Sequence, residues 1–192
     1  MPELSDEELC RKAAARDRGA FDQLVERHQA RAFRLARAVL GNDADALDVS
    51  QDAFIRLYES AHQFDGRSRF STWFHRILVN LCIDYQRRTK WWRRMLPLAS
   101  PDEDPQEPGI DPPSDKPGPD LEVMQRESVA KLDEALKRLS SNQRIAVMLQ
   151  AQEGLSSREI AAVLNCSENT ARVHIFRGLT QLKKMLREDQ TR

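Results

Sequence analysis

The chain has 192 residues, of which 40% are apolar, 31% charged and 6% aromatic, enough for one or two small domains but not for one large core. Its 30 basic and 30 acidic residues cancel, and its three cysteines lie far apart, a spacing that indicates neither a disulfide framework nor a zinc knuckle. No signal-peptide pattern is present and no apolar run approaches the ~20 residues of a membrane span, so we expect a soluble cytoplasmic protein that does not insert into a membrane.

Apolar residues recur at three- and four-residue steps in both halves of the chain, and no stretch alternates apolar with polar residues as a strand would. We therefore expect an all-α protein. Ser5 and Glu8 form a capping-box pattern for a first helix over 5–16. A second helix carries an apolar stripe up to Leu40 and should end at Gly41, because a residue without a Cβ suits a left-handed C-terminal position.

The next two helices should flank a loop over 64–70. We expect Asp43 to cap a helix that runs to about His62, and Ser71 to cap the helix after the loop. Inward candidates lie at helical spacing on both helices: Leu47, Phe54, Tyr58 and Ala61 on the first, and Phe74, Ile77, Leu78, Leu81, Cys82 and Tyr85 on the second. Residues 1–95 are thus predicted to form a small helical bundle.

Proline and acidic residues dominate the segment that follows. Eight of the nine prolines lie between Pro97 and Pro119, where acidic residues are dense and apolar residues scarce. Such a segment cannot build a core, so residues 96–120 are predicted to be an extended, flexible linker. At ~3.1 Å per residue it could reach roughly 74 Å, about two turns of B-DNA, and would join two small domains at an adjustable separation.

Residues 121–192 are predicted to form a second helical domain. Its first helix should run from a cap at Asp120 to about Leu139, and the next should start at Ser141 and stop at Gly154. Inward candidates on the first of these helices are Met124, Leu132, Leu136 and Leu139.

The next segment predicts a helix-turn-helix. Ser156 and Glu159 form a capping box for a short helix over 157–164, which ends in a tight turn at Asn165, and Ser167 caps a longer helix. So short a turn between two helices, with small alanines where the backbones must approach, is typical of DNA-binding helix-turn-helix units.

The longer helix has an apolar side and a side that suits the major groove. The residues expected to be buried are Ala171, Ile175, Leu179, Leu182 and Leu186. The opposite side carries Glu168, Asn169, Arg172, Val173, Phe176 and Arg177. Arginine can hydrogen-bond guanine or phosphate, and valine and phenylalanine can contact a thymine methyl group. The alternative is a helical hairpin whose arginines are merely solvated.

Charge is segregated along the chain despite the zero total. Residues 64–94 carry eight basic and two acidic residues, 99–122 carry one and eight, and 137–192 carry ten and five. In the first basic segment, aromatic residues that could stack on unpaired bases alternate with cations that could follow phosphates. They are Phe64, Phe70, Trp73, Trp91 and Trp92 among Arg67, Arg69, Arg76, Arg87, Arg88, Lys90, Arg93 and Arg94. The alternative places the aromatic rings in the core and leaves the arginines solvated, as we expect for Phe74.

Two long motifs resemble the bacterial sigma factors of the extracytoplasmic-function (ECF) type, group IV of the sigma-70 family. Residues 48–58 and 64–80 resemble sigma region 2, and residues 139–144 with the helix-turn-helix up to Arg177 resemble sigma region 4. The resemblance implies two small helical domains, 1–95 and 121–192, joined by the acidic linker. It also implies a factor that directs core RNA polymerase to promoters and opens the upstream DNA.

The resemblance assigns three groups of site residues. In the family, the residues that dock on the β′ clamp helices of the polymerase correspond to Asp45, Asp48, Gln51, Asp52 and Phe54. Those that read unpaired bases of the minus-ten element correspond to Phe64, Asp65, Gly66, Arg67, Ser68, Arg69, Phe70, Ser71 and Trp73. Those that contact the duplex minus-thirty-five element correspond to Ser157, Arg158, Arg172, Val173, Phe176 and Arg177.

The implied partners are core RNA polymerase, through its β′ clamp and β flap, promoter DNA, and an anti-sigma factor that could hold the protein near the membrane. No cofactor, metal or catalytic site is expected, because the four histidines are scattered. His28 and Cys82 lie on apolar stripes and should be packed, while the roles of Cys10 and Cys166 stay open. Two other classes also stay open: an ordinary helix-turn-helix regulator that binds duplex DNA alone, and a sigma-mimicking interaction protein.

Overall fold

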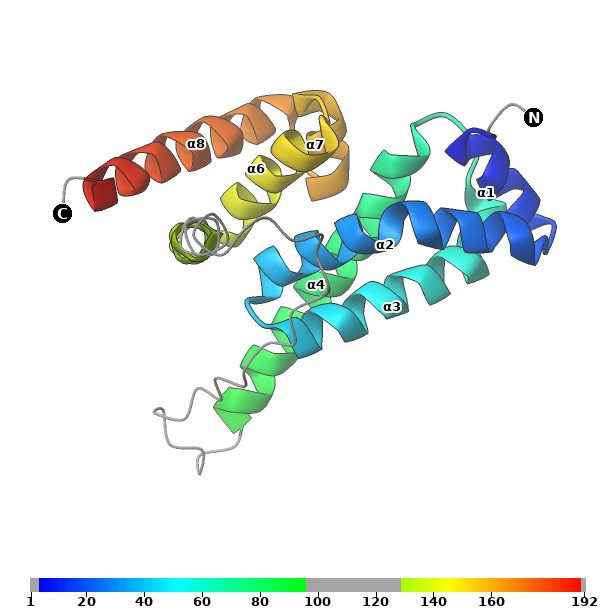
Figure 1. Ribbon diagram of the computed structural model, residues 1–192, viewed down its shortest axis with the longest axis horizontal. Coiled ribbons are helices and arrows are strands. Elements are labelled where there is room, and N and C mark those ends of the chain that lie inside the picture. The colour runs from blue at the N-terminus through cyan, green and yellow to red at the C-terminus, as the bar shows by residue number, and fades with distance from the viewer. Residues whose placement is uncertain (1–3, 96–128, 191–192) are drawn as a thin grey trace, which may run out of the picture.

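The computed structural model describes residues 4–95 and 129–190, and every regular element within these ranges is helical (Figure 1). The all-α prediction is confirmed. The predicted linker over 96–120 lies outside the described residues, as do Asp120 and Met124, so the domain boundaries stay a prediction. None of the described helices is both long and apolar enough to cross a bilayer.

The first helix, α1 (Asp6–Ala14), begins at the predicted capping box. The Ser5 N–H donates to the Glu8 carboxylate over 2.9 Å, and the Glu8 N–H donates to Ser5 Oγ over 3.2 Å. The helix ends two residues before position 16 because Arg16 turns into the left-handed region with φ 67°. Asp17 then accepts a hydrogen bond from the Ala20 N–H and starts the next helix.

That next helix, α2 (Arg18–Leu40), ends as predicted at Gly41, which has φ 90°. It is followed by α3 (Asp43–Ser60) and a short 3-10 helix, η1 (Ala61–Gln63). The cap of α3 is Asn42, whose side chain accepts from the Asp45 N–H, so the expected cap at Asp43 is one residue too late.

The fourth helix, α4 (Phe70–Met95), begins one residue before the expected cap, so Ser71 lies inside the helix. The Phe70 N–H donates instead to the carboxylate of Glu7, 3.1 Å away on α1. The carboxylate of Glu7, 63 residues earlier in the chain, therefore accepts from the first free N–H of α4. A contact between residues so far apart cannot be predicted from local sequence.

These helices pack into one bundle in which α2 lies against α1, α3 and α4 (Figure 1). The Phe54 ring packs 4.9 Å from the Phe74 ring at the centre. Leu47 was expected to point inward but is 50% exposed, because Ala46, Val49, Ala53 and Leu57 occupy the buried face of α3. Leu47 lies one residue, or about 100°, away from that face.

The second half of the chain contains a helix over 129–137, then α6 (Ser141–Glu153), α7 (Ser157–Leu164) and α8 (Glu168–Gln190). The predicted capping box of Ser156 and Glu159 is present, as are left-handed caps at Gly154 and Asn165. The short helix over 157–164 and the tight turn after it are thus confirmed.

Two apolar residues expected inside this half are exposed, namely Leu132 and Leu179. The reason on α8 is a close approach to α6 at Gly178, where an added Cβ would lie 2.7 Å from Val147 Cγ2. Because the bare backbone of Gly178 faces α6, the next residue, Leu179, turns away from the core. On the earlier helix, Ala135 and Leu136 take the buried positions.

The two halves pack directly on each other, with α6 against α2 and α7 against α4 (Figure 1). Arg144 of α6 connects them. Its guanidinium donates to the carbonyls of Ala38 (2.9 Å) and Val39 (3.3 Å) at the end of α2. It also donates to the carbonyl of Lys137 (2.9 Å), the last residue of the helix over 129–137, and to that of Leu139 (3.1 Å) just after it. Carbonyls at a helix C-terminus lack partners within the helix and carry a partial negative charge, so one cation holds two helix ends together.

We predict that Arg144→Ala lowers the free energy of unfolding by about 2 kcal/mol and loosens the contact between the halves, because it removes charged hydrogen bonds to four carbonyls. Urea denaturation and the radius of gyration from small-angle scattering would measure the two effects. Arg138→Ala, which removes an exposed arginine paired with Glu134, is the matched control and should change neither. Equal values for both variants would contradict this role for Arg144.

Candidate polymerase and nucleic-acid interfaces

The outer face of α3 combines carboxylates with apolar side chains. Of the residues predicted to bind polymerase, Asp48, Gln51 and Asp52 are exposed on this face. Beside them lie Leu47 and Ile55, which are 50% and 58% exposed. Residues 47, 51 and 55 follow each other at four-residue steps and so form one row beside the two aspartates. We call these five residues the α3 outer face.

The sequence analysis does not predict that the apolar members of the α3 outer face, Leu47 and Ile55, are exposed. Leu47 was assigned to the core, and Ile55 was not singled out. The signal that could have found them is their spacing of eight residues, which places them on one line with Gln51 and away from the buried row of α3.

The other two residues predicted to bind polymerase lie elsewhere. Phe54 is buried against Phe74 and supports the helix from inside. Asp45 sits in the first turn of α3, where its carboxylate accepts hydrogen bonds from the Asn42 side chain (2.7 Å) and from the Tyr85 hydroxyl of α4. The hydrogen bond to Asp45 raises the pKa of Tyr85. Asp45 therefore joins α3 to α4 at the edge of the outer face.

The loop between η1 and α4 presents two cations to solvent. Gly66 turns the chain with φ 72°, and the Asp65 carboxylate accepts from the Arg67 N–H over 3.0 Å and lies 3.2 Å from Arg67 Nε. The side chains of Arg67 and Arg69 are 89% and 70% exposed, so both can reach a ligand in solution.

An aromatic cluster supports this loop. Phe64 and Trp73 are half-buried, with ring centroids 5.3 Å apart, and so keep part of their surface open for stacking. Phe70 is fully buried and stacks on Phe74 at 5.9 Å. Phe70 could contact nucleic acid directly only by leaving the core. In its buried position it packs against Phe64 and Trp73 and supports them.

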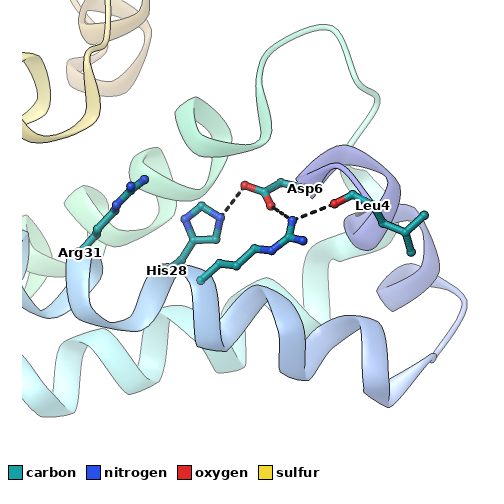
Figure 2. Close-up of a pocket in the computed structure, with 5 residues that line it drawn as sticks. Leu4, Asp6, His28 and Arg31 are labelled. Carbon is teal, nitrogen blue, oxygen red and sulfur yellow. Dashed lines mark hydrogen bonds and ion pairs between the residues drawn. The ribbon is translucent and has the colours of Figure 1, made fainter. Parts of the chain in front are cut away.

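A half-buried polar cluster joins the start of α1 to α2 (Figure 2). His28, packed as predicted, places its ring 5.1 Å from the Phe70 ring, and its Nε2 donates to the Asp6 carboxylate over 2.7 Å. Arg27 donates to the same carboxylate and to the Leu4 carbonyl, each over 2.8 Å. Burial alone would raise the pKa of Asp6, but hydrogen bonds from Arg27 and His28 outweigh it and lower that pKa. These hydrogen bonds thus hold the start of α1 against α2, beside Phe70 at the end of the loop.

The helix-turn-helix carries a small preorganised network at its tip. Arg172 lies 2.5 Å from the Glu168 carboxylate, and Ser157 donates to the same carboxylate over 3.2 Å. Arg172 Nε also donates to Ser157 Oγ over 3.4 Å. The remaining residues predicted to contact the minus-thirty-five element are all exposed: Arg158, Val173, Phe176 and Arg177.

The helix-turn-helix touches the start of α4 through Glu159. Its Oε1 atom lies 3.6 Å from Arg69 Nε and accepts from the Thr72 hydroxyl over 3.4 Å. Its Oε2 atom accepts from both the N–H and the hydroxyl of Ser156, at 2.9 and 2.7 Å. These hydrogen bonds from Ser156 lower the pKa of Glu159, so the carboxylate is anionic at neutral pH.

A second carboxylate at the same interface, Glu153 of α6, is buried between Arg31 (3.7 Å) and His75 (3.8 Å). Burial lowers the pKa of His75, although the charge of Glu153 acts against this shift. His75 is therefore mainly neutral at pH 7.

The described residues contain no group of three or more histidine, cysteine or acidic side chains that could hold a metal ion.

The cysteines differ in burial. Cys10, whose role the sequence leaves open, is fully buried, as is Cys82, which is predicted to lie in the core. Burial raises the pKa of Cys10 to about 11 and that of Cys82 to about 12. Cys166 is half-buried, and burial raises its pKa as well. All three thiols are thus protonated at neutral pH.

Two known families match the two halves of the chain. Residues 24–93 match the family described as Sigma-70 region 2, and residues 130–182 match the family described as Sigma-70, region 4. The first range contains the α3 outer face and the loop before α4, and the second contains the helix-turn-helix.

Curated relatives and solved structures extend over nearly the whole chain. The chain is 35% identical over 184 residues to the ECF RNA polymerase sigma factor SigM of Mycobacterium tuberculosis (strain ATCC 25618 / H37Rv), covering 96% of this chain and 86% of the relative. It is 31% identical over 176 residues to the ECF RNA polymerase sigma factor SigW of Bacillus subtilis (strain 168), covering 90% and 91%. A solved structure of CnrH in complex with the cytosolic domain of CnrY has a TM-score of 0.69 at 26% identity, over 97% of this chain and 99% of that chain.

A two-domain helical fold with both sigma regions defines a transcription initiation factor of the sigma-70 type. The chain belongs to the ECF sigma factors within this family, which direct core RNA polymerase to specific promoters.

Proposed function

We propose that three surfaces of this ECF sigma factor divide the work of transcription initiation. The α3 outer face binds the polymerase, the loop before α4 holds unpaired minus-ten bases, and the exposed side of α8 reads the duplex minus-thirty-five element. The observation that carries the proposal is that each surface is exposed and has the chemistry its ligand requires.

The α3 outer face suits a helical partner with basic residues. Leu47 and Ile55 offer apolar area, while Asp48 and Asp52 offer charge beside it. This combination of an apolar centre and a charged rim is typical of protein interfaces. We assign it to the β′ clamp of core polymerase, with Asp45 and Phe54 as supporting residues.

The loop before α4 suits unpaired bases. Arg67 and Arg69 can neutralise phosphates, and the open parts of Phe64 and Trp73 can each stack on a base, an interaction worth ~1–3 kcal/mol. Extracting a base from the duplex costs a few kcal/mol, so two such contacts are enough to offset it. The remaining residues assigned to the minus-ten element shape the turn or its support: Asp65, Gly66, Ser68, Phe70 and Ser71.

The exposed side of α8 suits the major groove. Ser157 and Glu168 hold the Arg172 guanidinium at the tip of the helix, which lowers the entropy lost when it binds guanine or phosphate. The same side of α8 also carries Val173, Phe176 and Arg177. Together with Arg172 they form a surface of two cations and two apolar groups.

The packing of the two halves bears on regulation. Because Glu159 engages Arg69 and Thr72, the helix-turn-helix must move before nucleic acid can take these positions. We infer that an anti-sigma factor controls this protein, as the solved complex of the relative CnrH with the cytosolic domain of CnrY suggests by analogy. We place the protein in the cytoplasm and expect no catalysis of its own.

Run-off transcription with purified core RNA polymerase, with and without this protein, tests the proposal on a pool of upstream fragments from its own genome. We expect discrete transcripts that appear only when the protein is added. Tight duplex binding without polymerase and without transcripts would instead identify an ordinary helix-turn-helix regulator.

We predict that Arg172→Ala weakens promoter binding by the holoenzyme by ~1–3 kcal/mol, because it removes one contact to a base or phosphate. Gel-shift titration on a promoter from the run-off experiment would measure the loss, and affinity for core polymerase should not change. Lys183→Ala, an exposed cation further along α8, serves as the control. A parallel loss of polymerase binding would contradict the assignment.

We predict that Asp48→Arg weakens binding to core polymerase at least tenfold, because it places a cation where a basic partner docks. Fluorescence anisotropy of labelled protein titrated with core polymerase would measure the change. Glu26→Arg makes the same charge reversal at an exposed position on α2 and should have no effect. Equal affinities for the two variants would remove the α3 outer face from the polymerase interface.

A further inference from the structure

The far end of α4 exposes two neighbouring tryptophans that no surface described above uses. Trp91 and Trp92 are 52% and 57% exposed, and their ring centroids lie 5.1 Å apart at an interplanar angle of 80°. Large aromatic side chains left in water beside each other mark a contact site more often than a single exposed apolar residue does.

Cations accompany the tryptophan pair on the same stretch of helix. Arg87, Arg88 and Lys90 are all exposed. Arg87 has an acidic neighbour, Asp84, at 3.9 Å, but an ion pair that is exposed on both sides contributes little. We call the two tryptophans and the three cations the α4 end patch. Its chemistry suits a ligand that combines apolar rings with negative charge.

A segment of the same chain has this composition. Residues 101–108, which lie outside the described residues, have the sequence PDEDPQEP, with four carboxylates, three prolines and no cation. Pro105 and Pro108 have the spacing of a PxxP motif, in which prolines favour an extended form that binds to aromatic rings at a low cost in conformational entropy. The carboxylates therefore match the cations of the patch, and the proline rings match the tryptophans.

The chain is long enough to bring this segment back along α4. From Met95, where α4 ends, to Arg87 the helix measures about 12 Å at 1.5 Å per residue. The seven residues from Met95 to Asp102 span up to ~22 Å at 3.1 Å per residue, so the first carboxylate can reach the patch. Gln86 of α4 contacts Ser141 of α6 at 3.5 Å, so the return of the chain to the second half leaves length to spare.

Attachment to the same chain makes a weak contact sufficient. A ligand on a short tether reaches an effective concentration on the order of millimolar. Exposed ion pairs and ring contacts that bind a free peptide only at about that concentration therefore hold the tethered segment about half of the time. The cations of α8 are a poorer match, because the three tryptophans of the chain are at positions 73, 91 and 92.

We propose that the α4 end patch binds residues 101–108 of its own chain in the free protein. The carboxylates pair with Arg87, Arg88 and Lys90, and the proline rings pack on the two tryptophans. The acidic segment then screens the basic end of α4 from other polyanions until a partner displaces it. This contact does not depend on which ligands bind the three surfaces proposed above.

Two variants with the same net charge test the contact in the free, full-length protein. The first removes the charges of the segment: Asp102→Asn, Glu103→Gln, Asp104→Asn and Glu107→Gln. The control removes four charges beyond it: Asp111→Asn, Asp115→Asn, Asp120→Asn and Glu122→Gln. Both are made with Trp73→Phe, which leaves Trp91 and Trp92 as the only tryptophans. We expect the first variant to raise acrylamide quenching of their emission about twofold, and the control to leave it unchanged.

A synthetic peptide of residues 99–110 tests the same contact in trans. Added to the first variant, it should protect the tryptophans from acrylamide at millimolar concentration, and 1 M salt should abolish the protection. Arg87→Ala with Lys90→Ala should weaken this binding about tenfold. Arg11→Ala with Lys12→Ala, which removes two exposed cations of α1, should not weaken it.

Three outcomes overturn the proposal. Equal quenching in the two linker variants would mean that the segment does not cover the tryptophans. Quenching that falls as the protein concentration rises would make a second copy of the chain the occupant. Protection by a 30-base-pair duplex of random sequence but not by the peptide would make the patch a site for nucleic acid alone. Failure of the proposed function looks different, because it removes the run-off transcripts and leaves the quenching results unchanged.

Discussion

The two halves of the chain meet around the guanidinium of Arg144. Arg144 bonds to carbonyls at the ends of two helices that come from different halves of the chain, and those carbonyls have no partners inside their own helices. Gln86, which donates to the Val39 carbonyl and accepts from the Ser141 hydroxyl, and the buried carboxylate of Glu153 add further links. Partly exposed ion pairs such as Arg37 with Asp133 contribute little individually. Loss of the guanidinium would remove hydrogen bonds to four carbonyls at once, so this side chain helps to fix the relative position of α2 and α6.

The position of α6 decides what else meets at the interface. With α6 against α2, α7 reaches the start of α4 and brings an acidic side chain to a cation of the nucleic-acid loop. In the function proposed above, a phosphate would bind the same cation, so the contact between the halves would compete with DNA binding for Arg69. On that proposal, the packing of the halves controls access to the loop without any change in the fold of either.

Features that depend on a few neighbouring residues could be predicted from the sequence, and features that depend on distant residues could not. Capping boxes and the left-handed caps at Gly41 and Asn165 are local, and the structure contains them. The start of α4 depends on Glu7, and the exposure of Leu179 depends on Val147 against Gly178. The sites divide similarly: residue type predicted the exposed arginines and helical spacing predicted the burial of Phe54, whereas the burial of Phe70 depends on the whole bundle.

The two oxygens of Glu159 perform separate tasks. One accepts the hydrogen bonds that begin α7, and the other faces the cation and hydroxyl at the start of α4. When the domains part, only the second oxygen exchanges its partners for water, and the helix keeps its cap. The recognition module can therefore part from α4 without unfolding α7, but its release must also break the hydrogen bonds of Arg144 and the buried contacts of Glu153.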